Sequence, residues 1–122
     1  MIALLLLALT ILGGTMAQTQ TNILSERYVS AAEELRVLTE KGEWHRASEV
    51  VAAYRADWQR TVTWLQMLIN HEDIDDVTLA LLRLQAGIQA QEQATCYEAC
   101  AELVENARHI HHRDAFTLGN VL

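Results

Sequence analysis

The stretch of sequence that decides the fold is residues 58–74, WQRTVTWLQMLINHEDI. Its first twelve residues carry two tryptophans, Trp58 and Trp64, and an apolar stripe at helical spacing. Its last five residues, Asn70 to Ile74, are typical of one helix ending and another beginning. The stretch therefore predicts two helices joined by a short turn.

The composition of the whole chain favours helices. No proline occurs among the 122 residues, and the five glycines stand at positions 13, 14, 42, 87 and 119, so most of the chain lacks residues that break helices. An apolar content of 51% is ample for one hydrophobic core. We therefore predict a single all-α domain.

The N-terminal residues 1–17 form the clearest targeting signal. Residues 2–12 are an unbroken aliphatic run apart from Thr10, and a small-residue pattern ends at Ala17. A signal peptide cleaved near Ala17 fits this pattern, although basic residues before the run are missing. A retained signal anchor is preferred, because the segment reaches the lower limit of about 17 residues for a membrane span. A buried helix of a cytosolic protein is the third interpretation.

Four helices are predicted behind a polar spacer at residues 18–24. Apolar residues recur every three or four positions in each of them. Ser25 and Asp73 are the expected N-caps of the first and third helices, and Gly42 is the expected left-handed end of the first. We predict a four-helix antiparallel bundle of two helical hairpins over residues 25–122. The expected helix bounds are Ser25–Lys41, Glu43–Asn70, Asp73–Ala90 and Gln93–His112.

The second predicted helix carries the longest regular apolar seam. The seam keeps a three-four alternation that holds one face toward a partner helix. A second row, Trp64, Met67 and His71, is expected to widen the buried face. The seam residues are Trp44, Ala47, Val51, Tyr54, Trp58, Thr61, Leu65 and Leu68.

The net charge of −7 is carried entirely after residue 25, by acidic residues spread along the chain. A scattered acidic surface promotes solubility. It argues against nucleic acid as a partner and against a polybasic membrane contact. The predicted partners are a membrane, through the N-terminal segment, and a protein partner or a second copy of the chain.

Two clusters resemble metal sites. Cys96 and Cys100 lie four residues apart on one helical face. Core packing is the preferred interpretation, because a disulfide within one regular helix is strained and a metal needs two further ligands. A disulfide, within the helix or between chains, is the second interpretation, and metal is the third. His109, His111 and His112 do not share one helical face, so a solvated helix end is expected there.

His71 is the most prominent single residue, because it stands at the predicted turn between Asn70 and Glu72. Its functional interpretation is a pH-sensitive or ligand-contacting imidazole. The preferred interpretation is a turn-organising residue whose ring nitrogens bond backbone groups. The acidic residues that follow lack the glycine and the distal glutamate of a calcium loop. Asn70, His71 and Glu72 are therefore candidate functional or turn-organising residues.

Residues along the chain resemble a known family. The pattern combines a Gly-x-Trp turn, an Asn-His-Glu turn and a closing Gly-Asn-Val-Leu, and it covers nearly the whole chain. It resembles the bacterial family called domain of unknown function 4363 (DUF4363), whose members usually carry Lys or Arg before the apolar segment, unlike this chain. The resemblance implies helical architecture and an envelope location, and it implies no catalytic residue. The residues that carry it are Gly42, Trp44, Ala47, Trp58, Trp64, Leu65, Ile69–Glu72, Ile74, Leu84, Ile88, His109, Ile110 and Gly119–Leu122.

The function expected is a non-catalytic, envelope-associated helical module with a structural or protein-interaction role. It would lie on a bacterial membrane with its bulk outside the cytoplasm, or be secreted after cleavage near Ala17. No catalytic pattern stands out, so we predict no enzyme activity and no cofactor. The alternative is an extracytoplasmic bundle that binds a small ligand or a metal through His71 and the cysteine pair. The Gly42–Ala47 pattern also resembles a tetratricopeptide hairpin, which leaves a repeat-like adaptor as a further interpretation.

Overall fold

The computed structural model describes the backbone of residues 1–67 and 69–121, and the side chains of residues 1–14, 19, 21–67 and 69–110. Within these residues the chain forms helices and no β-strand, so the predicted all-helical class is confirmed. The described helices are α1 (Ile2–Glu40), α2 (Trp44–Leu65), α3 (His71–Ala90) and α4 (Gln93–Val121).

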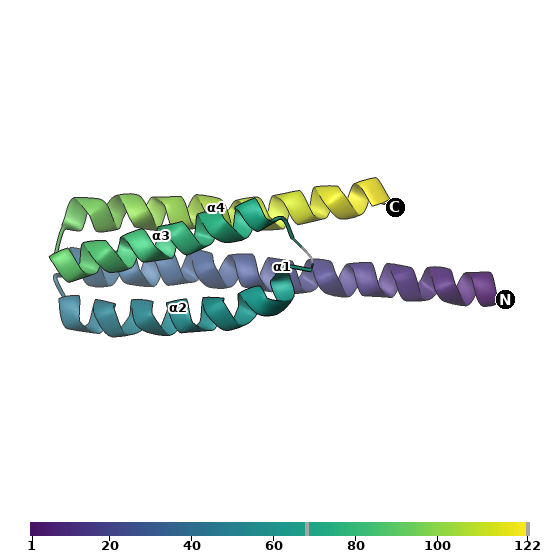
Figure 1. The fold of residues 1–122 in the computed structure, drawn as a ribbon, viewed down its shortest axis with the longest axis horizontal. Helices are drawn as coiled ribbons and strands as arrows, with labels where there is room; N and C mark the ends of the chain where they lie inside the picture. The colour runs from purple at the N-terminus through teal and green to yellow at the C-terminus, as the bar shows by residue number, and fades with distance from the viewer. Residues whose placement is uncertain (68, 122) are drawn as a thin grey trace.

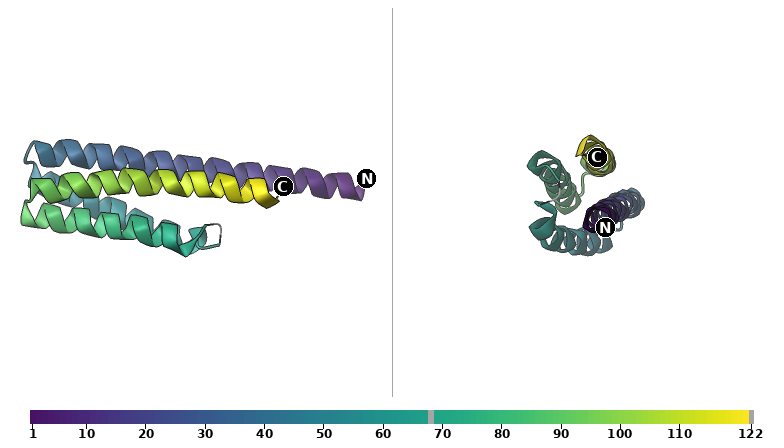
Figure 2. Two further views of the ribbon diagram at one scale, coloured as in Figure 1. Left: turned by 90° about the horizontal axis from the view of Figure 1, so that it is seen from above. Right: turned by 90° about the vertical axis from the view of Figure 1, so that its right-hand side faces the viewer.

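The helices lie side by side, and each runs opposite to the one before it (Figure 1). Helix α1 packs against α2 and α4, and α3 packs against the same two helices. The end-on view shows the helices around a common axis (Figure 2). Helix α1 extends past the others at its N-terminal end, and α4 also continues past the turn between α2 and α3 (Figure 1).

The core lies along the common axis and is formed by apolar residues from all the described helices. On α2 the predicted seam positions Ala47, Val51, Trp58 and Leu65 are buried, whereas Trp44, Tyr54 and Thr61 are half-buried. Leu68, the last predicted seam position, lies outside the described residues. The seam of α3 is buried as the periodicity predicts. The largest fully buried side chains include Trp58, Tyr28, Leu35, Leu65, Leu81, Leu84, Ile88, Leu103 and Ile110.

Helix α1 begins at Ile2, so the prediction that the first helix starts at Ser25 is wrong. Residues 18–24, predicted as a spacer, are helical, and Ser25 is buried within the helix. Residues 1–24 contain no proline, and their glycines, Gly13 and Gly14, do not interrupt the helix. A glycine inside a helix costs only about 1 kcal/mol relative to alanine. The other end agrees with the prediction, because Gly42 adopts a left-handed φ of 72° just after α1.

Helix α2 ends at Leu65, so the prediction that it reaches Asn70 is wrong. Asn70 is instead the N-cap of α3, because its side chain accepts a hydrogen bond of 3.3 Å from the backbone N–H of Glu72. Asp73, the predicted cap, is buried in the first turn. Asn is a preferred N-cap, and acidic residues just after it suit the helix dipole. The cap therefore stands at Asn70.

Helix α4 begins at Gln93 as predicted, but its backbone stays helical to Val121 and not only to His112. The preceding turn is formed by Gln91, which adopts a left-handed φ of 55°. Gly87 does not end α3 and is buried inside it. A methyl group on Gly87 would lie 3.1 Å from Cys96 Sγ, so this glycine lets α3 and α4 approach closely.

Candidate functional site

The N-terminal arm, defined as residues 1–14, is the largest unusual surface among the described residues. Each of its leucine and isoleucine side chains is at least half exposed, from 50% at Ile11 to 76% at Ile2. Soluble proteins rarely expose an apolar surface of this extent unless it contacts a membrane or a protein. The exposed leucines and isoleucines are Ile2, Leu4, Leu5, Leu6, Leu7, Leu9, Ile11 and Leu12.

The polar side chain of the arm is satisfied within the helix. The hydroxyl of Thr10 donates a hydrogen bond of 2.8 Å to the carbonyl of Leu6. A hydroxyl bonded in this way costs little when it enters an apolar phase. Within the part of the chain that the structure describes, no helix combines the length and the apolarity needed to cross a bilayer.

The turn before α3 brings together the three residues singled out from the sequence. Asn70 caps the helix through the N–H of Glu72, while the side chains of His71 and Glu72 are exposed in the first turn. The expected second buried row is not formed at this end. Trp64, inside α2, is 42% exposed, and Met67 is 87% exposed. Met67 follows the end of α2 at Leu65, so it no longer keeps the helical period of the row.

Cys96 and Cys100 are buried free thiols on the inner face of α4. Burial raises the pKa of Cys100 to about 12, and burial together with Glu92 raises the pKa of Cys96. A neutral thiol is a weak nucleophile and must lose its proton to bind a metal. In this structure the two cysteines act as small core residues.

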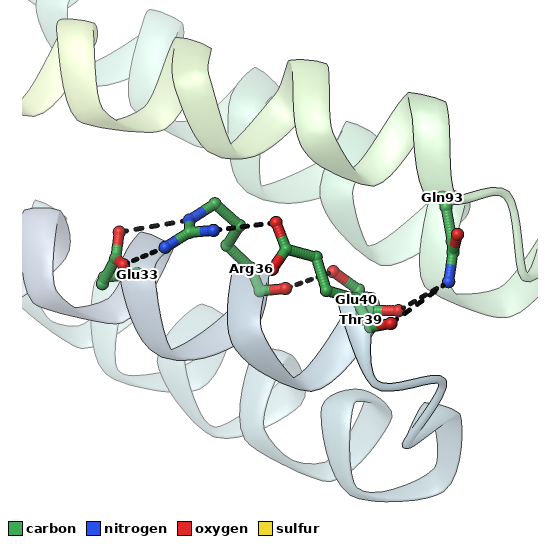
Figure 3. Close-up of polar contacts among 5 residues, drawn as sticks. All are labelled: Glu33, Arg36, Thr39, Glu40 and Gln93. Atoms are coloured by element: carbon green, nitrogen blue, oxygen red, sulfur yellow. Dashed lines mark hydrogen bonds and ion pairs between the residues drawn. The ribbon is translucent and has the colours of Figure 1, made fainter.

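A polar cluster joins α1 to the start of α4 (Figure 3). Arg36 bonds the carboxylates of Glu33 and Glu40, with 2.7 Å between Arg36 Nη1 and Glu40 Oε1. Gln93 Nε2 donates to the carbonyl of Thr39 at 3.2 Å. Gln93 thereby caps the last turn of α1 from another helix. The sequence did not indicate this contact, because its two residues lie far apart along the chain.

A small pocket of about 100 Å³ lies beside this cluster, between Arg36 and Cys100, with Tyr97 also in its lining. Ligand sites typically enclose about 300 Å³ or more. The charge of Arg36 is already compensated, and the hydrogen bond from Arg36 lowers the pKa of Glu33. The pocket therefore offers neither the volume nor an uncompensated charge for a charged small ligand.

A second polar network ties α1 to α2, and sequence reasoning missed it. The hydroxyl of Tyr28 donates to Asp57 Oδ2 at 2.8 Å, and Arg27 pairs with Asp57 Oδ1 at 3.2 Å. The ring of Tyr28 stands edge-on to Trp58 with 5.1 Å between ring centroids. Burial and the neighbouring Asp57 raise the pKa of Tyr28. The hydroxyl is therefore engaged in holding the helices together.

The predicted ligand residues do not come together. His71 opens α3, whereas Cys96 on α4 lies beside Gly87, about 24 Å further along α3 at 1.5 Å per residue. His109 is exposed, and the side chains of His111 and His112 lie outside the described residues. Among the described side chains, no group of three or more His, Cys, Asp or Glu is placed to hold a metal ion.

Comparison with protein families gives one finding. The family model described as Domain of unknown function (DUF4363) matches residues 15–121. The matched region includes α2, α3, α4 and the part of α1 that follows the arm. No curated protein and no solved structure matches the chain.

Proposed function

The chain belongs to the DUF4363 family, and we propose that it is a non-catalytic helical module of the bacterial cell envelope, attached to a membrane by its N-terminal arm. In this proposal residues 25–122 form a four-helix antiparallel bundle of two helical hairpins outside the cytoplasm. The acidic surface of this bundle meets a protein partner or a second copy of the chain.

The exposed apolar arm is the observation that carries the proposal. Each leucine or isoleucine near the centre of a bilayer favours insertion by about 0.3–0.6 kcal/mol, so the eight in the arm favour it by about 2–5 kcal/mol. The arm is about 20 Å long at 1.5 Å per residue, which is more than half of a hydrocarbon core of about 30 Å. The bonded hydroxyl of Thr10 adds no large penalty.

The side chains that could take part in chemistry are already engaged in contacts within the protein, which supports a structural role. The hydroxyl of Tyr28 and the guanidinium of Arg36 are both held by carboxylates, and burial keeps the thiol of Cys100 protonated. The hydroxyl of Tyr28 joins α1 to α2, the guanidinium of Arg36 is paired along α1, and Cys100 packs in the core, so each of these groups already has a structural use. The alternative of a bundle that binds a small ligand or a metal gains no support from the positions of its predicted ligands, because His71 opens α3 whereas Cys96, on α4, lies beside Gly87 near the other end of α3.

Fractionation of a bacterial host expressing the full-length chain tests the proposal, with the mass of the mature N-terminus determined. A mass that starts at Met1 in the membrane fraction identifies a retained anchor. A mass that starts near Gln18 in the exported fraction identifies a cleaved signal. Both results support an envelope location, but a chain that starts near Gln18 has lost the arm and refutes attachment through it. An intact chain that is soluble in the cytoplasm contradicts the envelope location itself.

Matched variants separate the arm from general surface apolarity. The double variant Leu5→Asp, Leu9→Asp places charges on the arm and is expected to leave the chain in the cytoplasm. Leu79→Asp is the control, because Leu79 is 58% exposed on α3, close to the 62% of Leu5. Equal fractionation of the two variants would contradict a role of the arm.

A further inference from the structure

Two large apolar side chains are exposed at the turn between α2 and α3, which we name the α2–α3 tip and define by Trp64 and Met67. Their exposed fractions are 42% and 87%. Trp58, on the same helix, is 1% exposed and donates a hydrogen bond of 2.8 Å to the hydroxyl of Thr78. Trp58 therefore belongs to the core, whereas the tip faces outward.

The tip lies at the end of the helical domain from which the arm projects (Figure 1). The same relation holds in the view turned by 90° (Figure 2). Helix α1 is continuous between the arm and the part that packs beside α2, so the two surfaces keep a fixed relation. When the arm enters a bilayer along its own axis, the end of the domain that carries the tip faces that bilayer.

The side chains at the tip suit the boundary between headgroups and acyl chains. Tryptophan concentrates at this boundary, because its ring is apolar and its indole N–H is polar. Methionine is flexible and adapts to irregular apolar surroundings. Both are therefore side chains that gain from contact with lipid at this depth.

The charges near the tip exclude an attraction to anionic lipids. Glu72, Asp75 and Asp76 are exposed in the first turns of α3, and Glu105 is exposed on the neighbouring part of α4. Among the described side chains, the exposed cations there are Arg60 on α2 and Arg108 on α4, so acidic residues outnumber them. This net negative charge is repelled by anionic headgroups. The contact must therefore be apolar, and it fits a bilayer with neutral, zwitterionic headgroups.

We propose that the α2–α3 tip is a second membrane contact, in which Trp64 and Met67 insert at the headgroup boundary of the zwitterionic bilayer that holds the arm. The contact rests on the proposed function, since the arm brings the tip to the bilayer. It fixes the domain against the membrane at two points.

Tryptophan quenching by brominated lipids tests this contact. The full-length chain is incorporated into phosphatidylcholine vesicles whose acyl chains carry bromine close to the headgroup. Trp64 is expected to account for the quenched intensity, so quenching is lost in Trp64→Phe. Trp44→Phe is the matched control, because Trp44 opens α2 at the opposite end, and this variant is expected to retain the quenching. Met67→Asp is expected to reduce it, whereas Leu79→Asp leaves it unchanged.

The outcomes separate the two proposals. A chain that sediments with the vesicles but shows the same quenching with and without Trp64 refutes the tip contact and leaves the arm in place. A chain that stays in the supernatant refutes the proposed function and the tip contact with it. Circular dichroism of each variant shows whether its helical content is retained. Trp64→Phe is expected to retain it, because Trp64 is 42% exposed and is not one of the buried core residues.

Discussion

Gly87→Ala is expected to destabilise the domain, because it places a methyl group where α3 and α4 lie close together. A methyl group at position 87 would lie 3.1 Å from Cys96 Sγ and from Thr95 Cγ2, and 3.3 Å from the backbone nitrogen of Cys96. The last contact involves the backbone of α4, which cannot rotate away as a side chain can. The two helices must therefore move apart to admit the methyl group.

Two opposing effects set the magnitude. Replacing glycine by alanine inside a helix stabilises it by about 1 kcal/mol. Inserting a methyl group into a closely packed core costs about 1–3 kcal/mol. The expected net result is a loss of about 1 kcal/mol in the free energy of unfolding. Gly14→Ala is the control, because a methyl group there would meet nothing within 4 Å, and no loss is expected.

Urea denaturation of the full-length chain in mild detergent, followed by circular dichroism at 222 nm, measures the loss. Repeating Gly87→Ala in a Cys96→Ala background removes one of the short contacts, so the loss is expected to shrink there. A Gly87→Ala chain as stable as the original, or more stable, would refute the close approach. An equal loss in both backgrounds would assign the effect to Thr95 and the backbone, and not to the thiol.

Three further results are expected from the same denaturation measurement. Tyr28→Phe removes the hydroxyl that donates to Asp57 and is expected to cost about 1–2 kcal/mol, with a midpoint equal to that of the original chain counting against the network. Asn70→Ala removes the cap of α3 and is expected to cost about 1 kcal/mol, whereas Asn70→Asp should retain most of the stability. Because burial raises the pKa of Cys100 from 9.0 to about 12, the stability from its neutral thiol is complete below pH 9 and is lost as the pH rises toward 12. The slope is up to about 1.4 kcal/mol per pH unit, and Cys100→Ala should make it shallower.

The helical class and most of the core follow from local sequence. Trp58, Leu65 and Leu81 recur at helical spacing without a breaker, so their burial is predictable from the periodicity alone. The position of the α2–α3 turn was missed, although Asn70 followed by Glu72 and Asp73 is a recognisable cap with an acidic first turn. The apolar residues between Leu65 and Asn70 extended the helical pattern past its true end.

The polar contacts between helices do not follow from local sequence. Gln93 caps α1 across the domain, and Tyr28 meets Asp57 on another helix. Such pairs depend on the register between helices, which periodicity does not specify. The exposure of Trp64 also could not be predicted from local sequence. A tryptophan at helical spacing has the same pattern as a core residue, and its burial depends on how the helices pack.

The unbroken course of α1 determines how the domain can move. A flexible tether would let an attached domain search a hemisphere, with an effective concentration set by the length of the tether. A continuous helix from the arm into the core instead connects the two rigidly. A membrane or protein that holds the arm therefore also sets the height and the tilt of the domain. A partner presented at another height or angle gains nothing from the attachment. If the arm is held in a membrane as proposed, rotation about the axis of α1 and lateral diffusion are the motions that remain to the domain.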